Sequence, residues 1–236
     1  MPPESVARLS APDSALQAGA AALGCPLTPV QLQGLREYSA LLKRWGRVHN
    51  LTAVRDAQRI DVLHLLDSLA IVPTLSRHVS TAGLSSPHLL DVGSGGGLPG
   101  VVVAIARPSW PVTCIDAVAK KVAFVRQVAL ELGLQNLSAE HRRVGGGEGR
   151  ASAQVVVSRA FAALADFCVW TRDELAPRGV WCAMKGRVPD DEVAALPEDV
   201  EMFHVERLTV PGLDAERCAV WLRPRREPDR AAPAPA

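Results

Sequence analysis

The stretch Asp91-Val92-Gly93-Ser94-Gly95-Gly96-Gly97-Leu98-Pro99-Gly100 places five of the chain's 18 glycines within ten residues. It begins within the strand-like apolar run over 88–92, and a helix is expected over 98–106. Glycine adopts positive φ at little cost and lets backbone N–H groups approach a ligand closely. The helix that follows directs its positive end toward the same place. The stretch therefore predicts a strand, a tight turn and a helix that together hold a nucleotide-like ligand.

Two ligands fit such a loop. Gly95-x-Gly97-x-x-Gly100 matches the dinucleotide fingerprint, which would indicate NAD. However, Asp91 at the strand end suits a cationic amino-acid cofactor better than a diphosphate, and Pro99 removes an N–H donor near the helix start. Asp116 ends the next apolar run, where a carboxylate accepts hydrogen bonds from both ribose hydroxyls. Together these residues favour a pocket for S-adenosylmethionine (SAM), with NAD as the alternative.

The chain after residue 87 alternates between short apolar runs and helical periodicity. Strands are expected over 88–92, 112–116, 137–144, 155–158 and 179–185, with helices over 98–106, 118–132 and 161–175. This alternation is typical of an α/β fold with a mostly parallel sheet and helices on both faces. Two late runs, 202–210 and 218–223, are expected to pair as antiparallel strands at the sheet edge.

Two amphipathic helices precede the first expected strand. Thr28 is a candidate N-cap with Pro29 at the first helical position, and apolar residues follow at helical spacing to Trp45. A second helix is expected from about 56 to 72, with Pro73 beside its end. We divide the chain into a mobile N-terminal segment (1–29), an N-terminal helical annex (30–75), an α/β domain (76–223) and a disordered Pro/Ala/Arg tail (224–236).

Composition excludes several classes of protein. The chain has 236 residues, 48% of them hydrophobic and 22% charged, as in an ordinary globular protein. No apolar stretch is long enough to span a membrane, and the five cysteines form no C-x-x-C pair, so we expect reduced thiols, no metal site and a cytoplasmic location. The net charge of +1 means that a nucleic acid would have to be bound by a local patch.

With the glycine loop in view, the chain resembles the RsmG (GidB) family of bacterial ribosomal RNA methyltransferases from about residue 35 to residue 222. The resemblance implies a Rossmann-like SAM-dependent methyltransferase fold, preceded by the annex. It also implies methyl transfer from SAM to N7 of a guanine in 16S ribosomal RNA of the small subunit, by an enzyme expected to be a monomer. The matching motifs are WGRVHNLTAVR (45–55), His64 with Asp67-Ser68-Leu69, the loop DVGSGGGLPG (91–100), Asp116 with Lys120-Lys121, Ser158-Arg159-Ala160, Met184-Lys185-Gly186 and Asp191-Glu192.

The resemblance also implies roles for individual residues. Gly93, Gly95 and Leu98 would line the SAM site, Asp116 would hold the ribose, and Val144 with Gly145 would lie against the adenine. The chain departs from the family pattern at three positions: Gly145 where the family commonly has Glu, Ala117 where it has Ser, and Gln154 where it has Asp. We expect SAM binding to persist despite these differences.

Guanine N7 carries a lone pair and no proton, so no general base is expected. The protein's task is positioning, and Arg159 is the candidate because ligands bind at the carboxyl ends of strands in open α/β sheets. Its guanidinium would pair with the methionine carboxylate of SAM or with a phosphate of the target.

A basic stretch over 36–59 is the candidate RNA surface, with Arg44, Arg47, Asn50 and Arg55 as its proposed contacts. An ordinary solvated helix face is the alternative, and Asn50 would equally cap a turn. Lys185, which ends a strand, is either a second cation beside the RNA or the partner of a nearby carboxylate.

Other interpretations remain open. His64, Asp67 and Ser68 have the composition of a hydrolase triad, but one helical face holds them too close together for that chemistry, so packing against the glycine loop is the preferred role. An NAD-dependent oxidoreductase and a non-catalytic RNA-binding protein on the same fold stand as alternatives to the methyltransferase.

Overall fold

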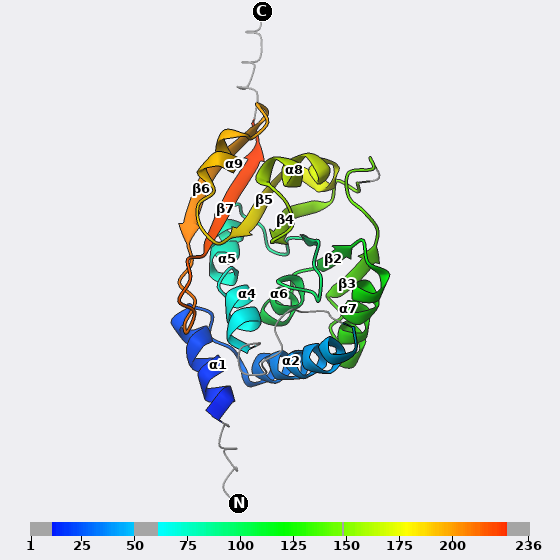
Figure 1. Cartoon of the computed structure of the whole chain (residues 1–236), viewed down its shortest axis with the longest axis vertical. Coiled ribbons are helices and arrows are strands. Elements are labelled where there is room, and N and C mark those ends of the chain that lie inside the picture. The colour runs from blue at the N-terminus through cyan, green and yellow to red at the C-terminus, as the bar shows by residue number, and fades with distance from the viewer. Residues whose placement is uncertain (1–10, 50–60, 148, 226–236) are drawn as a thin grey trace, which may run out of the picture.

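A computed structural model describes residues 11–49, 61–147 and 149–225. Its centre is a seven-stranded sheet of order β3-β2-β1-β4-β5-β7-β6, with β6 and β3 at the two edges (Figure 1). The first five strands run parallel, and β7 joins β5 antiparallel. The strands are β1 Leu89–Val92, β2 Val112–Asp116, β3 Leu137–His141, β4 Ala153–Arg159, β5 Leu175–Lys185, β6 Val200–Arg207 and β7 Cys218–Pro224. The expected fold class is thus confirmed, including the antiparallel pair at the edge.

Helices cover both faces of the sheet (Figure 1). One face packs against α2 (Pro29–His49), α4 (Asp67–Leu69), α5 (Val72–Thr81), α6 (Gly100–Ala106) and α7 (Ala119–Glu131) in one hydrophobic core. The other face packs against α8 (Leu164–Trp170) in a second core, to which α9 (Asp190–Ala194) adds partly buried residues. The sequence predicts one helix over 161–175, but it ends at Trp170 and a short 3-10 turn, η2 (Arg172–Glu174), leads into β5. All five cysteines are buried free thiols, as expected.

Helix α2 begins where the sequence predicts. Thr28 Oγ1 accepts from the Gln31 backbone N–H at 3.3 Å, and Gln31 Oε1 accepts from the Thr28 N–H at 2.9 Å. This reciprocal pair satisfies two backbone donors at the helix start, as in a capping box. At the buried face of α2, the Tyr38 hydroxyl donates to the Gly96 carbonyl at 2.6 Å. The annex therefore holds the glycine loop directly.

Two expectations for the N-terminal part differ from the structure. The segment 1–29, predicted to be mobile, includes residues 11–22, which form helix α1 (Ala11–Ala22) and bury Leu16 and Ala20 in the larger core. Pro73 does not close a helix but occupies the first turn of α5, where its missing N–H costs no hydrogen bond. The chain preceding it forms η1 (Asp61–Leu66), a π-helical turn, followed by α4.

The turn between β1 and α6 needs glycine at its last position. A Cβ added at Gly100 would lie 2.5 Å from Cys114 Sγ and 2.8 Å from Asp91 Oδ2. The Gly100 N–H donates to that same Asp91 oxygen at 2.8 Å, so helix α6 starts in contact with β1. Close packing of the helix on the strand is therefore possible only without a side chain.

We predict that Gly100→Ala lowers the free energy of unfolding by about 1–3 kcal/mol, because the added methyl overpacks a buried site that cannot open freely. Gly146→Ala is the matched control, since nothing lies within 4 Å of its Cβ position. Chemical denaturation of both variants checks this. Equal stability of Gly100→Ala and Gly146→Ala would contradict the packing described here.

Candidate active site

A pocket opens at the carboxyl ends of β1, β2 and β4, where ligands bind in open α/β sheets. Its volume is about 550 Å³, within the range of about 300–1,000 Å³ typical of small-molecule sites. The lining combines an apolar floor with one carboxylate and three cations. It consists of Val92, Gly93, Ile115, Asp116, Ala117, Lys121, Arg142, Arg143, Val144, Gly145, Ala160, Phe161 and Trp170.

The glycine loop is tied by its backbone to the end of β2. The Gly93 and Ser94 N–H groups donate to the Ile115 carbonyl at 2.9 and 3.1 Å. Gly93 has φ +68°, and a Cβ there would come within 2.4 Å of the Phe161 ring. Glycine thus allows both the turn and the close approach of Phe161, and these two residues form one wall of the pocket.

Asp116 holds the loop from the neighbouring strand. Its Oδ2 accepts from the Gly95 N–H at 3.0 Å, and its Oδ1 accepts from the Val118 N–H at 2.8 Å. Lys121 Nζ lies 3.6 Å from Oδ2 and balances the charge. Each carboxylate oxygen has two acceptor sites, so one remains on each oxygen. Asp116 therefore fits a ligand with two adjacent hydroxyls, such as a ribose.

Aromatic and apolar side chains form the part of the pocket beside Val144 and Gly145. Phe161 and Trp170 meet edge to face, with ring centroids 5.9 Å apart at 86°. Gly145 has φ +89°, and its Cβ position is 3.4 Å from Trp170. The Glu that the family commonly has here would be strained in this backbone conformation, so the glycine suits the local structure. A planar apolar ring such as adenine fits against this wall.

Two carboxylates hold the side chain of Arg142 in place at the rim of the pocket. It makes two hydrogen bonds to the buried carboxylate of Glu174 and one of 2.8 Å to Glu140 Oε2. The bonds to Glu174 raise the pKa of the arginine further above its already high value. Arg143 beside it is exposed and has no ion pair within the described part of the chain.

Of the glycine loop, only Val92 and Gly93 line the pocket. Leu98 is only 5% exposed and packs in the core, because an apolar side chain at the start of α6 gains more from burial there. Asp91 is fully buried beneath the loop, where loss of solvent raises its pKa to about 7. Its Oδ1 has no hydrogen-bond partner among the described residues. Gly95 contributes through its N–H bond to Asp116 and does not line the pocket.

Arg159 stands at the carboxyl end of β4, as predicted, but its side chain turns toward the annex. Its Nη1 donates to Asp67 Oδ2 at 3.0 Å, and Arg217 Nε donates to Asp67 Oδ1 at 2.8 Å. Asp67 is 4% exposed, so one buried carboxylate holds two guanidinium groups. In a hydrolase triad the carboxylate would orient the histidine. Asp67 instead accepts hydrogen bonds from two arginines, which agrees with the expectation that His64, Asp67 and Ser68 form no triad.

His64 lies beside this cluster. Burial and the nearby Arg159 lower the pKa of His64 to about 4, so the imidazole is neutral at pH 7. Its Nδ1 is 3.5 Å from Arg159 Nη2, while its Nε2 and the Ser68 hydroxyl are buried without a partner among the described residues.

The predicted RNA contacts fare differently. The Lys185 ammonium donates one hydrogen bond to the Ala162 carbonyl at 2.9 Å and one to each carboxylate oxygen of Glu192. All three of its N–H groups are therefore used, and Lys185 is the partner of a nearby carboxylate. Arg44 is 63% exposed and pairs with Glu131 of α7. Asn50, Arg55 and the side chain of Arg47 lie outside the described residues.

Most residues that line this pocket were not predicted as site residues from the sequence. Phe161, Trp170, Arg142 and Arg143 carry no motif of their own, and Lys121 appeared only within a matched pair of lysines. Phe161 follows a strand end by two residues, a position that could have indicated it. The described residues contain no cluster of His, Cys, Asp or Glu arranged to hold a metal, and none of their helices is both long and apolar enough to cross a bilayer.

Comparison with known proteins agrees with this geometry. Ribosomal RNA small subunit methyltransferase G of Acidovorax sp. (strain JS42) is 58% identical over 218 residues, covering 90% of this chain and 95% of the relative. The protein of the same name from Leptothrix cholodnii is 55% identical over 211 residues, covering 89% and 94%.

Solved structures support the fold alone. A SAM-dependent methyltransferase from Aquifex aeolicus matches with a TM-score of 0.51 and 15% identity, covering 73% of this chain and 96% of that chain. TrmN from Thermus thermophilus matches with a TM-score of 0.51 and 18% identity, covering 66% and 48%. The family model described as GidB, rRNA small subunit methyltransferase G, matches residues 31–220. With most of its length matched, this chain belongs to the GidB family of rRNA small subunit methyltransferases.

Proposed function

We propose that the protein transfers a methyl group from SAM to N7 of a guanine in 16S ribosomal RNA. The observation that carries the proposal is the pocket in which Asp116 ties down the glycine loop and still offers two acceptor sites. Asp116 would hold the ribose, Gly93 and Phe161 would flank the cofactor, and Trp170 with Val144 and Gly145 would contact the adenine. Membership of the GidB family supports the reaction and the small-subunit RNA as its substrate.

The same loop argues against the NAD alternative. A pyrophosphate at a helix N-terminus needs free backbone N–H groups. Here the Gly97 and Leu98 N–H groups donate to the Ser94 carbonyl at 2.8 and 3.0 Å, and Gly100 donates to Asp91. Pro99 has no N–H to give. Residues 97–100 therefore offer no free backbone N–H to a diphosphate.

Bound SAM supplies an electrophilic methyl on a sulfonium, so the N7–carbon bond forms as the carbon–sulfur bond breaks and the sulfur keeps the electron pair. No proton moves, and the pocket agrees with this. Asp116, the one carboxylate among the described residues that line it, already accepts two backbone N–H groups beside Lys121. The chain's contribution is alignment, which can lower a barrier by about 7–11 kcal/mol.

Arg159 is the proposed positioning residue for this step. With Nη1 on Asp67, its guanidinium is fixed at the end of β4 between the glycine loop and the annex. We propose that the remaining N–H bonds of Arg159 meet the methionine carboxylate or a phosphate of the target. RNA contacts by Arg44, Arg47, Asn50 and Arg55 are retained in the proposal because these residues share one basic stretch.

We propose a monomer in the cytoplasm as the working form. Five free, buried cysteines are what a reducing compartment favours.

The function is tested by incubating the protein with labelled SAM and three substrates: deproteinised 16S RNA, small subunits and whole ribosomes from cells that lack the protein. We expect label in 16S RNA, mapped by mass spectrometry to a single N7-methylguanine. Label on protein, or none on any RNA form, would contradict the proposal.

Trp170→Ala should raise the Kd for SAM about 5- to 100-fold, because stacking of a base on an aromatic ring contributes about 1–3 kcal/mol. Trp170 is 43% exposed, so its loss should leave the fold intact. Val169→Ala, at a neighbouring residue 60% exposed and outside the pocket lining, is the control. Calorimetric titration measures both, and equal Kd values would remove Trp170 from the adenine site.

Arg159→Ala should slow single-turnover methyl transfer about 10- to 100-fold, the effect of losing a hydrogen bond to a charged group. Asp67 keeps Arg217 as a partner, but its buried Oδ2 loses one at a cost of about 1–3 kcal/mol, so transfer is measured below the lowered thermal unfolding temperature of the variant. Unchanged turnover in a folded variant would show that Arg159 does not position the reactants.

A further inference from the structure

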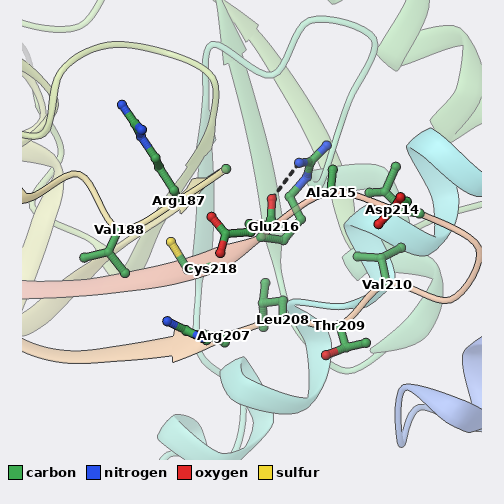
Figure 2. Close-up of a pocket in the computed structure, with 13 residues that line it drawn as sticks. Arg187, Val188, Arg207, Leu208, Thr209, Val210, Asp214, Ala215, Glu216 and Cys218 are labelled. Carbon is green, nitrogen blue, oxygen red and sulfur yellow. Dashed lines mark hydrogen bonds between the residues drawn. The ribbon is translucent and has the colours of Figure 1, made fainter.

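A second pocket lies between the end of β5 and the connection from β6 to β7 (Figure 2). Its volume is about 650 Å³, larger than the pocket assigned to SAM. Lys185 at the carboxyl end of β5 is the strand partner of Cys218 at the start of β7. This pocket therefore lies at the carboxyl ends of the parallel strands, as the SAM site does. The two pockets share no lining residue.

Arg187 and Arg207 form the basic side of this pocket. Both are exposed, and neither has an ion-pair partner among the described residues. Three basic residues outside the pocket lining are paired: Lys185 with Glu192, Arg77 with Glu206, and Arg223 with Glu201. Figure 2 shows both arginines at the opposite side of the pocket from Asp214. Two carboxylates, Asp214 and Glu216, line the same pocket, but in the described part of the chain neither forms an ion pair with Arg187 or Arg207.

Arg217 connects this pocket to the candidate active site. It lines the second pocket while its Nε bonds to Asp67 at 2.8 Å, and Asp67 bonds to Arg159 at 3.0 Å. The two sites are thus joined through one buried carboxylate, Asp67.

The remaining walls suit a sugar and a base. Val188, Leu208, Val210 and Leu213 supply apolar surface, and Thr209 adds a hydroxyl. Of the two carboxylates in the lining, Asp214 lies across the pocket from the arginines, whereas Glu216 lies on their side (Figure 2). Its carboxylate forms no ion pair with either arginine.

We propose that this pocket binds a nucleotide of the substrate RNA next to the target guanine, with Arg187 and Arg207 on its phosphates. The inference rests on the proposed function in that the ligand is RNA. An unpaired strand fits best, because its phosphates and bases are free to enter a pocket separately. Glu216 limits the affinity by repelling the phosphate, which eases release of the methylated product.

The test measures binding of deproteinised 16S RNA by filter retention at several salt concentrations. The double variant Arg187→Ala/Arg207→Ala should bind about tenfold more weakly at low salt. The slope of log K against log salt should become shallower by about 0.7 for each phosphate that no longer has an arginine beside it. Glu216→Gln should bind RNA several-fold more tightly than the unaltered protein, a gain that a purely structural role would not produce.

Arg178→Ala is the matched control, because Arg178 is exposed and stands at the other end of β5. It should leave RNA affinity and its salt dependence unchanged. The Kd for SAM should be the same in all variants, since none of these residues lines the SAM pocket. RNA affinity unchanged in the double variant, or weakened equally by Arg178→Ala, overturns the proposal.

Two further outcomes separate the failures. If the unaltered protein transfers no methyl to any RNA, the proposed function fails, while the binding data still decide the role of the pocket. If the double variant binds naked RNA normally and loses activity only on assembled subunits, the pocket contacts a ribosomal protein and the inference is wrong.

Discussion

The pair of hydrogen bonds from the Gly95 and Val118 N–H groups to Asp116 is the constraint on which the candidate site depends. A glycine-rich turn is mobile unless its backbone groups are paired, because glycine loses more conformational entropy on ordering than any other residue. Asp116, which lies at the end of the neighbouring strand β2, removes that freedom from the loop. The same carboxylate keeps one acceptor site per oxygen, so ordering the loop and recognising a ribose are performed by one group.

The N-terminal annex contributes a second layer of constraint. Tyr38 of α2 holds the Gly96 carbonyl, and Asp67 of α4 holds Arg159 and Arg217. These buried polar contacts join the annex to the glycine loop, to the end of β4 and to the connection between β6 and β7. Displacement of the annex would leave buried polar groups without partners, a cost of about 1–3 kcal/mol each. We therefore regard the annex as part of the active-site support.

Local patterns predicted the fold well. Strand β2 has the predicted bounds, and the T-P-V-Q sequence at the start of α2 forms the expected cap, because both depend on residues close in the chain. Pro73 was assigned wrongly because proline is equally compatible with the end of one helix and the first turn of the next. Leu98 was placed in the site by its position in a motif, whereas burial directs its side chain to the core.

The site was predictable only in part. Gly93, Asp116, Val144 and Gly145 line the pocket as the sequence indicated. Phe161 and Trp170 come from segments whose approach depends on how α8 packs on the sheet, and no local spacing encodes that contact. Similarly, Glu192 lies seven residues after Lys185 in the chain. Only the fold shows that both oxygens of its carboxylate accept hydrogen bonds from the Lys185 ammonium.

We infer that residues 97–100 offer no free backbone N–H while Asp116 keeps acceptors for a ribose, so the pocket takes SAM and no dinucleotide. Isothermal titration of the full chain with SAM and with NADH tests this most directly. The account predicts saturable binding of one SAM per chain and no measurable heat with NADH. Tight binding of NADH together with no binding of SAM would contradict it.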